Sequence, residues 1–424
     1  MREAFLHYVW KYQLFEHTDL LTTHGETLQI IKPGHHNSNA GPDFIEASLV
    51  INTIEWRGQV EIHIQSSDWY HHRHENDPNY QNAILHVVWK HDKEVVLQDG
   101  SSLPTIELYD KVDSRLLDRY ERLVNFPAAT IPCERQFEQV DDIHKLSMID
   151  KLAVQRLKAK GEVVLSLIDA TNGDWEEVAY QMLAKNFGLK VNADAFNTLS
   201  KHLPYRIIRK YAGRLLSIEA LLFGMAGFLS DAKGEYQEKL RSEFEYLRQK
   251  HELVPALEKH QWKTLRMRPA NFPTIRIAQL AAILSSAQSL FASFIHSEPN
   301  AIKAILSAEP SVFWSDHYSF EKSTEKVGSR AGATMIDLVM INTVAPILAA
   351  YSIHKDEQSS MDKALMLLQR VSPENNKLVN IFIQLGMRPE SGFDTQAYIH
   401  WHNEYCAKRR CLQCAVGVAL MRSS

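Results

Sequence analysis

The stretch RGQVEIHIQSSDWYHHRH, from Arg57 to His74, decides what the first part of the chain can be. In its first half, QVEIHIQ, side chains alternate between two faces because successive residues of a strand point to opposite sides. The valine and the two isoleucines form an apolar face suited to packing on a helix, and Glu61 and His63 lie together on the other face. The alternation predicts a half-buried strand that presents a carboxylate beside an imidazole.

Strand-and-turn segments surround this stretch up to about residue 135. Runs such as ETLQII, ASLVIN, AILHVVW and EVVLQ are short and rich in β-branched residues, and turn sequences such as PGHHNSNAGPD separate them. The opening segment Arg2–Phe15 instead places apolar residues at helical spacing, and beyond residue 136 helical periodicity runs almost throughout. We therefore predict an α+β fold with two domains. Residues 1–135 form a mixed β-sheet with a flanking helix, and residues 136–424 form a mostly α-helical region closed by a cysteine cluster.

Composition narrows the class of protein. A formal net charge of −4 excludes a globally basic nucleic-acid binder but allows local basic patches. Four cysteines are too few for a disulfide scaffold of this size, and the start, MREAFLHYVWKYQLF, lacks the features of a secretory signal. No apolar run reaches the roughly 18–20 residues that a membrane span needs. We expect a protein of the reducing cytoplasm that does not enter a membrane.

A second carboxylate precedes the neighbouring strand. Asp43, in the sequence GPDF, stands at the entry to ASLVIN, so the two strands are expected to bring Asp43 close to Glu61. Two carboxylates with a proton acceptor beside them suit the binding of Mg²⁺ or Mn²⁺ and the activation of water for phosphodiester hydrolysis.

This arrangement resembles the PD-(D/E)xK signature of a nuclease superfamily, with Pro-Asp at 42–43 and Glu-Ile-His at 61–63. The resemblance implies a restriction-endonuclease-like fold for the N-terminal domain. It also implies that Asp43 and Glu61 bind the catalytic metal and that His63 takes the place of the usual lysine.

Two further points follow from the same resemblance. An acid in the opening helix often assists in this superfamily, and Glu3 and Glu16 both qualify. The histidine at position 63 departs from the pattern, which implies either an altered metal preference or the loss of nuclease activity.

Histidines gather around the same strand. The first 92 residues hold 11 of the chain's 20 histidines, including His71, His72, His74 and His86. Single histidines on a wet sheet edge are common, but a cluster of imidazoles and carboxylates also suits Zn²⁺, Mn²⁺ or Fe²⁺. One alternative function is therefore a metallo-enzyme that acts on a small substrate with His71, His74 and His86 as ligands. Another is an inactive nuclease-like scaffold that binds nucleic acid or protein.

The C-terminus carries a second potential metal site. Cys406, Cys411 and Cys414 form C-x4-C-x2-C, and the two-residue spacing allows two thiolates to bind one metal. The fourth ligand is either Cys133 or His402. A distant first cysteine followed by three at the end resembles the iron–sulfur staple of some nucleases of the same superfamily. Zinc and a [4Fe–4S] cluster both remain open at this stage.

Over nearly its full length, the chain also resembles a family of uncharacterised bacterial proteins known only as a domain of unknown function. The resemblance is carried by NAGPDF, GQVEIH, SDWYHHRHENDPNY, ILHVVW, RPANFPTIR and the terminal cysteine motif. It implies no activity, but it implies that these segments belong to one architecture. The function expected from the sequence is a metal-dependent nuclease with nucleic acid as its partner and Asp43, Glu61 and His63 as catalytic residues.

Overall fold

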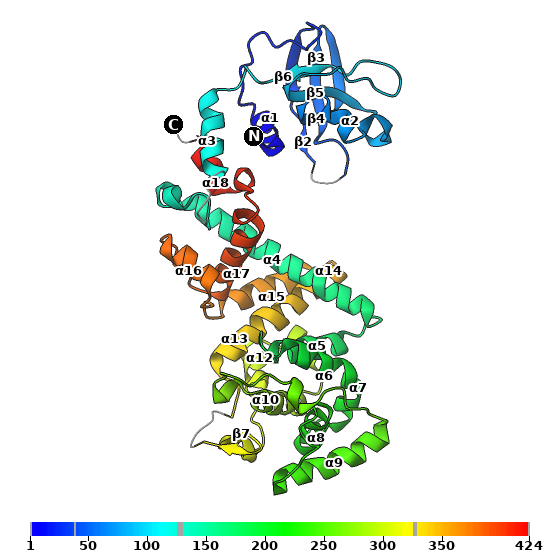
Figure 1. Ribbon diagram of the computed structural model, residues 1–424, viewed down its shortest axis with the longest axis vertical. Coiled ribbons are helices and arrows are strands. Elements are labelled where there is room, and N and C mark those ends of the chain that lie inside the picture. Colours follow the sequence, from blue (N-terminus) through cyan, green and yellow to red (C-terminus); the bar gives the residue numbers. More distant parts are fainter. Residues whose placement is uncertain (1, 38–39, 125–129, 325–328, 423–424) are drawn as a thin grey trace. The chain divides into compact units, whose positions relative to one another are not determined.

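The chain divides into two compact units that interleave along the sequence (Figure 1). The computed structural model describes residues 2–37, 40–124, 130–324 and 329–422. Unit 1 comprises Met1–Met148 and Trp401–Ser424, and unit 2 comprises Ile149–His400. Unit 2 is thus an insertion in the sequence of unit 1.

Unit 1 is built on a mixed sheet with the strand order β1-β3-β4-β5-β6, and β2 pairs with β3 at one end. β3 is antiparallel to β1 and β4, whereas β5 is parallel to both β4 and β6. The elements before the boundary with unit 2 are α1 (Glu3–Lys11), β1 (Leu28–Lys32), β2 (His35–His36), β3 (Phe44–Ile51), β4 (Ile54–Gln65), α2 (Asp68–His71), η1 (His74–Asn76), η2 (Pro78–Tyr80), β5 (Ala83–Lys90), β6 (Thr105–Glu107), α3 (Ser114–Val124), η3 (Glu134–Gln139) and the start of α4 (Asp142–Ala170).

Both faces of the sheet are covered. On one face, Val60 and Ile62 of β4 join a large apolar core with Phe5 and Val9 of α1, as the alternation in QVEIHIQ predicts. On the other face, a smaller apolar cluster forms around Trp69 and neighbours from η2 and the segments that flank β5 and β6. Glu61 and His63, which point to this second face, are therefore buried rather than solvated.

The C-terminal segment of unit 1 consists of η9 (Trp401–Cys406), η10 (Cys411–Gln413) and α18 (Ala415–Arg422). Cys411 and Met421 of this segment are part of the core that also contains α1. α18 packs against α3, and η10 packs against α1. The end of the chain thus completes the N-terminal core.

Among its described residues, unit 2 is helical apart from one short hairpin. It comprises the rest of α4, α5 (Trp175–Phe187), α6 (Ala193–His202), α7 (Tyr205–Ile208), η4 (Arg209–Tyr211), α8 (Leu215–Met225), α9 (Glu235–His251), η5 (Lys259–Gln261), η6 (Pro269–Asn271), α10 (Pro273–Ser286), α11 (Leu290–His296), α12 (Pro299–Leu306), η7 (Val312–Ser315), β7 (His317–Ser319), β8 (Lys322–Ser323), α13 (Ala333–Val339), η8 (Met340–Val344), α14 (Ala345–Lys355), α15 (Gln358–Gln369), α16 (Lys377–Gln384) and α17 (Gly392–His400). The predicted α+β class, with a mixed sheet followed by a mostly helical region, is confirmed.

The division of the chain differs from the predicted one in two respects. The boundary falls after Met148, inside α4, rather than at residue 135, because one continuous helix runs through it. The segment Trp401–Ser424, which was expected to belong to the helical domain, is part of unit 1. Its apolar residues pack on α1 and α3, a long-range contact that sequence periodicity does not report.

One helical run, Ala333–Lys355, is long and apolar enough to cross a membrane, contrary to the expectation that no such run exists. However, 72% of its most apolar window is buried inside the structure. Burial of this extent is typical of a core helix.

Candidate metal centre

The register of two strands brings Asp43 and Glu61 together. β3 and β4 are antiparallel with Phe44 opposite Val60, so Asp43, directly before β3, lies next to Glu61. The Asp43 N–H donates to Oε2 of Glu61 at 3.1 Å, and the Ile62 N–H donates to Oδ2 of Asp43 at 3.0 Å. Each carboxylate therefore accepts a main-chain N–H from the segment that carries the other. The expectation that these two neighbouring strands bring Asp43 close to Glu61 is confirmed.

The second oxygen of Glu61 faces two imidazoles. Oε1 lies 3.3 Å from Nε2 of His74 and 3.6 Å from Nε2 of His63. Burial raises the pKa of Glu61 to about 7, although the hydrogen bond with His74 acts in the opposite direction. A carboxylate in this position needs a proton or a cation close to it, because an isolated buried charge is costly.

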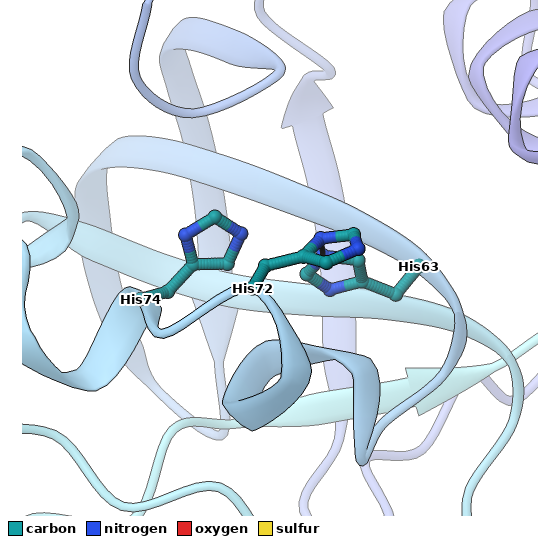
Figure 2. A group of neighbouring side chains, drawn as sticks. All are labelled: His63, His72 and His74. Carbon is teal, nitrogen blue, oxygen red and sulfur yellow. Dashed lines mark hydrogen bonds between the residues drawn. The ribbon is translucent and has the colours of Figure 1, made fainter.

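Three imidazoles, those of His63, His72 and His74, lie close together (Figure 2). One ligand nitrogen from each of His63, His72 and His74 lies within 4.8 Å of the other two. Nε2 of His63 is 3.1 Å from Nδ1 of His72. Two nitrogens bonded to one tetrahedral ion at about 2.0–2.1 Å are about 3.3 Å apart, so the observed spacing suits a shared metal ion. Imidazole ligands suit Zn²⁺ or Fe²⁺, and the carboxylate of Glu61 beside them also suits Mn²⁺.

His86 contacts the ring nitrogen of His63 that is not the one close to His72. Nδ1 of His63 lies 2.8 Å from Nε2 of His86, and the two side chains are buried. Burial lowers the pKa of His63 to about 3 and the pKa of His86 well below its usual value, so both rings are neutral. When Nδ1–H of His63 donates to His86, Nε2 keeps a lone pair facing the site, as a metal-bound histidine requires. His86 thus positions a ligand and is not placed to be one.

A tight turn explains why His72 and His74 both reach the site. α2 ends at His71, and Arg73 between the two histidines has a φ of 63°, in the left-handed region that reverses the chain. The ring of His74 stacks on Tyr80 with 3.9 Å between the ring centroids, which fixes its orientation. The turn therefore presents two imidazoles to β4 from outside the sheet.

Helix α1 adds two titratable groups. Nε2 of His7 lies 3.3 Å from Oδ2 of Asp43, and Glu3 is close enough to interact with the charges of both His7 and Asp43. Burial lowers the pKa of His7, but the hydrogen bond and the charge of Asp43 outweigh burial and raise it. Of the two acids expected to assist, Glu3 lies near the site. Glu16 is exposed, and its N–H donates to the carbonyl of Lys111 elsewhere in unit 1.

A family model for a protein of unknown function, DUF2851, matches residues 3–377. The chain belongs to the DUF2851 family. The predicted membership of an uncharacterised family is confirmed. No curated protein and no solved structure matches the chain in the comparisons made.

The part shared with the DUF2851 family contains the whole candidate metal centre. It covers α1, β3, β4 and the turn that carries His72 and His74. It also includes Cys133 but ends before the three C-terminal cysteines. The histidine cluster therefore lies within the part that the family model describes.

Besides His86, two more of the predicted histidine ligands, His71 and His402, lie outside the gathered histidines. The side chain of His71 is 72% exposed, its Nδ1 contacts Asp68 at 3.2 Å, and its ring is not one of the three gathered imidazoles. The neighbouring His72 takes the place expected for His71. His402 contacts Asn403 at 3.0 Å and is absent from the residues that line the cavity between the cysteines.

Sequence reasoning missed His7 and did not single out His72. His7 follows Glu3 by four residues, so both lie on one face of α1, and this spacing was a usable signal. The choice between His71 and His72 depends on the left-handed turn at Arg73, for which the sequence carries no clear signal.

Proposed function

We propose that this chain is a metal-dependent nuclease that hydrolyses phosphodiester bonds, with Asp43 and Glu61 as ligands of the metal ion. The observation that carries the proposal is the fixed pairing of these two carboxylates across β3 and β4. Carboxylates held in place by main-chain N–H groups are preorganised for a hard cation.

The order of the surrounding elements supports the proposal by analogy. A helix with an acid (Glu3), a strand preceded by Asp43, and a next strand with Glu61 and His63 follow one another in unit 1. This order corresponds to the PD-(D/E)xK pattern that the sequence resembles. An analogy at this level argues for the chemistry only together with the site geometry.

The imidazoles beside Glu61 argue for a particular metal. Mg²⁺ prefers oxygen ligands, whereas Mn²⁺ and Zn²⁺ also accept nitrogen. Since His63 and His74 lie beside Oε1 of Glu61, and His72 lies close to both of these histidines, we expect Mn²⁺ to support activity better than Mg²⁺. A bound divalent ion supplies Lewis acidity and makes a bound water more acidic.

The remaining side chains have distinct tasks. His72 is the exposed member of the three histidines, so as a ligand it would hold the ion where a water from solvent can reach it. His7 holds Oδ2 of Asp43, and His86 holds the ring of His63. These two contacts keep the ligands in orientation.

The test is a cleavage assay on the purified full-length protein. Single-stranded and double-stranded DNA and RNA are incubated with Mg²⁺, Mn²⁺ or a chelator. We expect cleavage that needs the metal and is faster with Mn²⁺. Binding of nucleic acid without cleavage under every metal condition would contradict the proposal and favour a non-catalytic scaffold.

A second function is favoured by one specific observation, the convergence of His63, His72 and His74. Three imidazoles suit a single Zn²⁺ or Fe²⁺ in a metallo-enzyme that acts on a small substrate. Tightly bound zinc or iron at this site, together with hydrolysis of small phosphate esters but not of polynucleotides, would favour this function over the nuclease.

A further inference from the structure

All four cysteines of the chain meet in unit 1. Cys133 comes from the segment after α3, and the other three come from the C-terminal η9, η10 and the residue after it. They line one small cavity of about 10 Å³, together with Ile131, Pro132, Phe137, Trp401, Tyr405, Arg410 and Gly417. So little space is left at van der Waals contact distances that an organic ligand does not fit without displacing the lining. An occupant must instead bond to the sulfurs themselves, at bond lengths much shorter than contact distances.

The thiols are near neighbours. All four line the same cavity, and Cys133, Cys406 and Cys411 each lie close enough to other cysteines of the group to interact with their charges. None of the four forms a disulfide. Four thiols that line one cavity without forming a disulfide are able to act together as ligands of a metal centre.

The spacing of the sulfur atoms discriminates between the two metal centres. Among the residues that the structure describes, no three of the four sulfurs lie within 4.8 Å of one another. Four sulfurs bonded to a single zinc at about 2.3 Å are about 3.8 Å apart and leave no space between them. Thiolates at the corners of a four-iron cluster are about 6–7 Å apart and do leave a space. The open arrangement therefore suits the cluster.

The surroundings suit a buried, negatively charged cluster. The aromatic side chains of Phe137, Trp401 and Tyr405 shield the cavity from water. Arg410 lines the cavity, and Arg409 lies close enough to Cys406 and Cys411 to interact with their charges. Positive charge beside the sulfurs stabilises their thiolate form, which is the form that binds metal.

Close backbone packing supports the same site. A Cβ on Gly417 would collide with the main-chain carbonyl of Cys411, so only glycine lets α18 approach η10 at this point. The approach keeps Cys411 and Cys414 directed into the cavity that Gly417 also lines.

We infer that the four cysteines together ligate an iron–sulfur cluster of the four-iron type. Unit 2, residues 149–400, lies between Cys133 and Cys406 in the sequence. Bonds from one cluster to both cysteines fasten the C-terminal segment onto the core of unit 1 and close a very long loop. The inference is independent of the proposed nuclease activity, because it rests on the cysteines alone.

The experiment is the metal analysis of the full-length protein purified without oxygen. We expect about four iron atoms and four acid-labile sulfides per chain, with visible absorption that bleaches on reduction with dithionite. Cys133→Ser and Cys414→Ser should each lose most of the iron. His402→Ala is the matched control and should keep it, because His402 does not line the cavity.

A second measurement does not depend on whether the cysteine variants fold. Wild-type protein is freed of metal and then reconstituted with ferrous iron and sulfide, or with zinc. Recovery of the spectrum together with a higher melting temperature supports the cluster. One zinc per chain without iron, or no uptake of iron and sulfide on reconstitution, would overturn the inference. An iron content of Cys133→Ser equal to that of wild type would overturn the four-cysteine ligand set.

Discussion

Asp43 and Glu61 are linked by two reciprocal hydrogen bonds, in which the carboxylate of each residue accepts a main-chain N–H from the segment that carries the other. The Asp43 N–H donates to Glu61 Oε2 at 3.1 Å, and Asp43 Oδ2 accepts the Ile62 N–H at 3.0 Å. Neither side chain can swing away without leaving a buried polar group unpaired, which costs about 1–3 kcal/mol. The arrangement keeps two carboxylates in place before any ion binds.

The pairing predicts that two substitutions of Asp43 separate structure from metal binding. Asp43→Asn retains an oxygen that accepts the Ile62 N–H, so its free energy of unfolding should stay within about 1 kcal/mol of wild type. Asp43→Ala loses this acceptor and the contact with His7 and should be less stable by about 1–3 kcal/mol. Both should bind Mn²⁺ at least about tenfold more weakly, measured by calorimetry. Unchanged Mn²⁺ affinity in Asp43→Asn would exclude Asp43 as a ligand.

The raised pKa of Glu61 predicts how the stability of the metal-free protein depends on pH. The folded protein keeps the proton up to a pH of about 7, whereas the unfolded chain loses it near 4.5. Between these values the folded state binds more protons, so stability should fall as pH rises, by up to about 3 kcal/mol. Glu61→Gln has no carboxyl group to titrate at this position, so it should not show this fall in stability. The measurement is urea unfolding in chelator at pH 5 and pH 8.

The difference in pH dependence between wild type and Glu61→Gln reports the contribution of Glu61 alone, because the other titrating groups are the same in both proteins. Wild type should lose more stability than Glu61→Gln between the two pH values, and Mn²⁺ should restore wild type at pH 8 because the ion replaces the proton. Identical pH dependence in both proteins would show that Glu61 does not titrate in this range.

Neighbouring histidines offer a matched test of the three-histidine site. His72→Ala removes a nitrogen 3.1 Å from His63 and should weaken Zn²⁺ or Mn²⁺ binding by about tenfold or more. His71→Ala removes an exposed ring that contacts only Asp68 among the described groups and should leave metal affinity unchanged. Equal effects of the two substitutions on metal titrations would argue against a specific site at His72.

The close packing at Gly417 predicts that a single added methyl group lowers the stability of the protein. Gly417→Ala pushes a Cβ into the carbonyl of Cys411 and should lower the free energy of unfolding by about 1–3 kcal/mol. Gly234→Ala is the control, because nothing lies within 4 Å of a Cβ at that position. Melting curves of both variants provide the measurement. A Gly417→Ala protein as stable as the control would contradict the close packing of α18 on η10.

The sequence predicted those features that follow from local pattern. The alternation in QVEIHIQ placed Glu61 and His63 on one face of a strand, and GPDF placed Asp43 at the entry of the adjacent one. The mixed sheet followed by helices was also predictable, because strand and helix periodicities differ. The spacing C-x4-C-x2-C, and the presence of one further cysteine, indicated which four thiols gather.

The features that the sequence did not predict depend on long-range contacts or on the backbone angles of single residues. The left-handed conformation of Arg73 selects His72 over His71. The boundary between the units lies inside α4, where helical periodicity continues unchanged. The return of the C-terminal segment to the core around α1 is a tertiary contact, and no local pattern encodes it.

The most direct test of the nuclease proposal is the rate of Mn²⁺-dependent cleavage by Glu61→Gln and Glu55→Gln, measured side by side with wild type. Both substitutions neutralise a carboxylate on β4, but Glu55 lies at the exposed end of the strand and contacts Arg57 and Ser48. The account predicts that Glu61→Gln abolishes cleavage while the protein remains folded, and that Glu55→Gln cleaves like wild type. A folded Glu61→Gln protein that cleaves nucleic acid at the wild-type rate would contradict it.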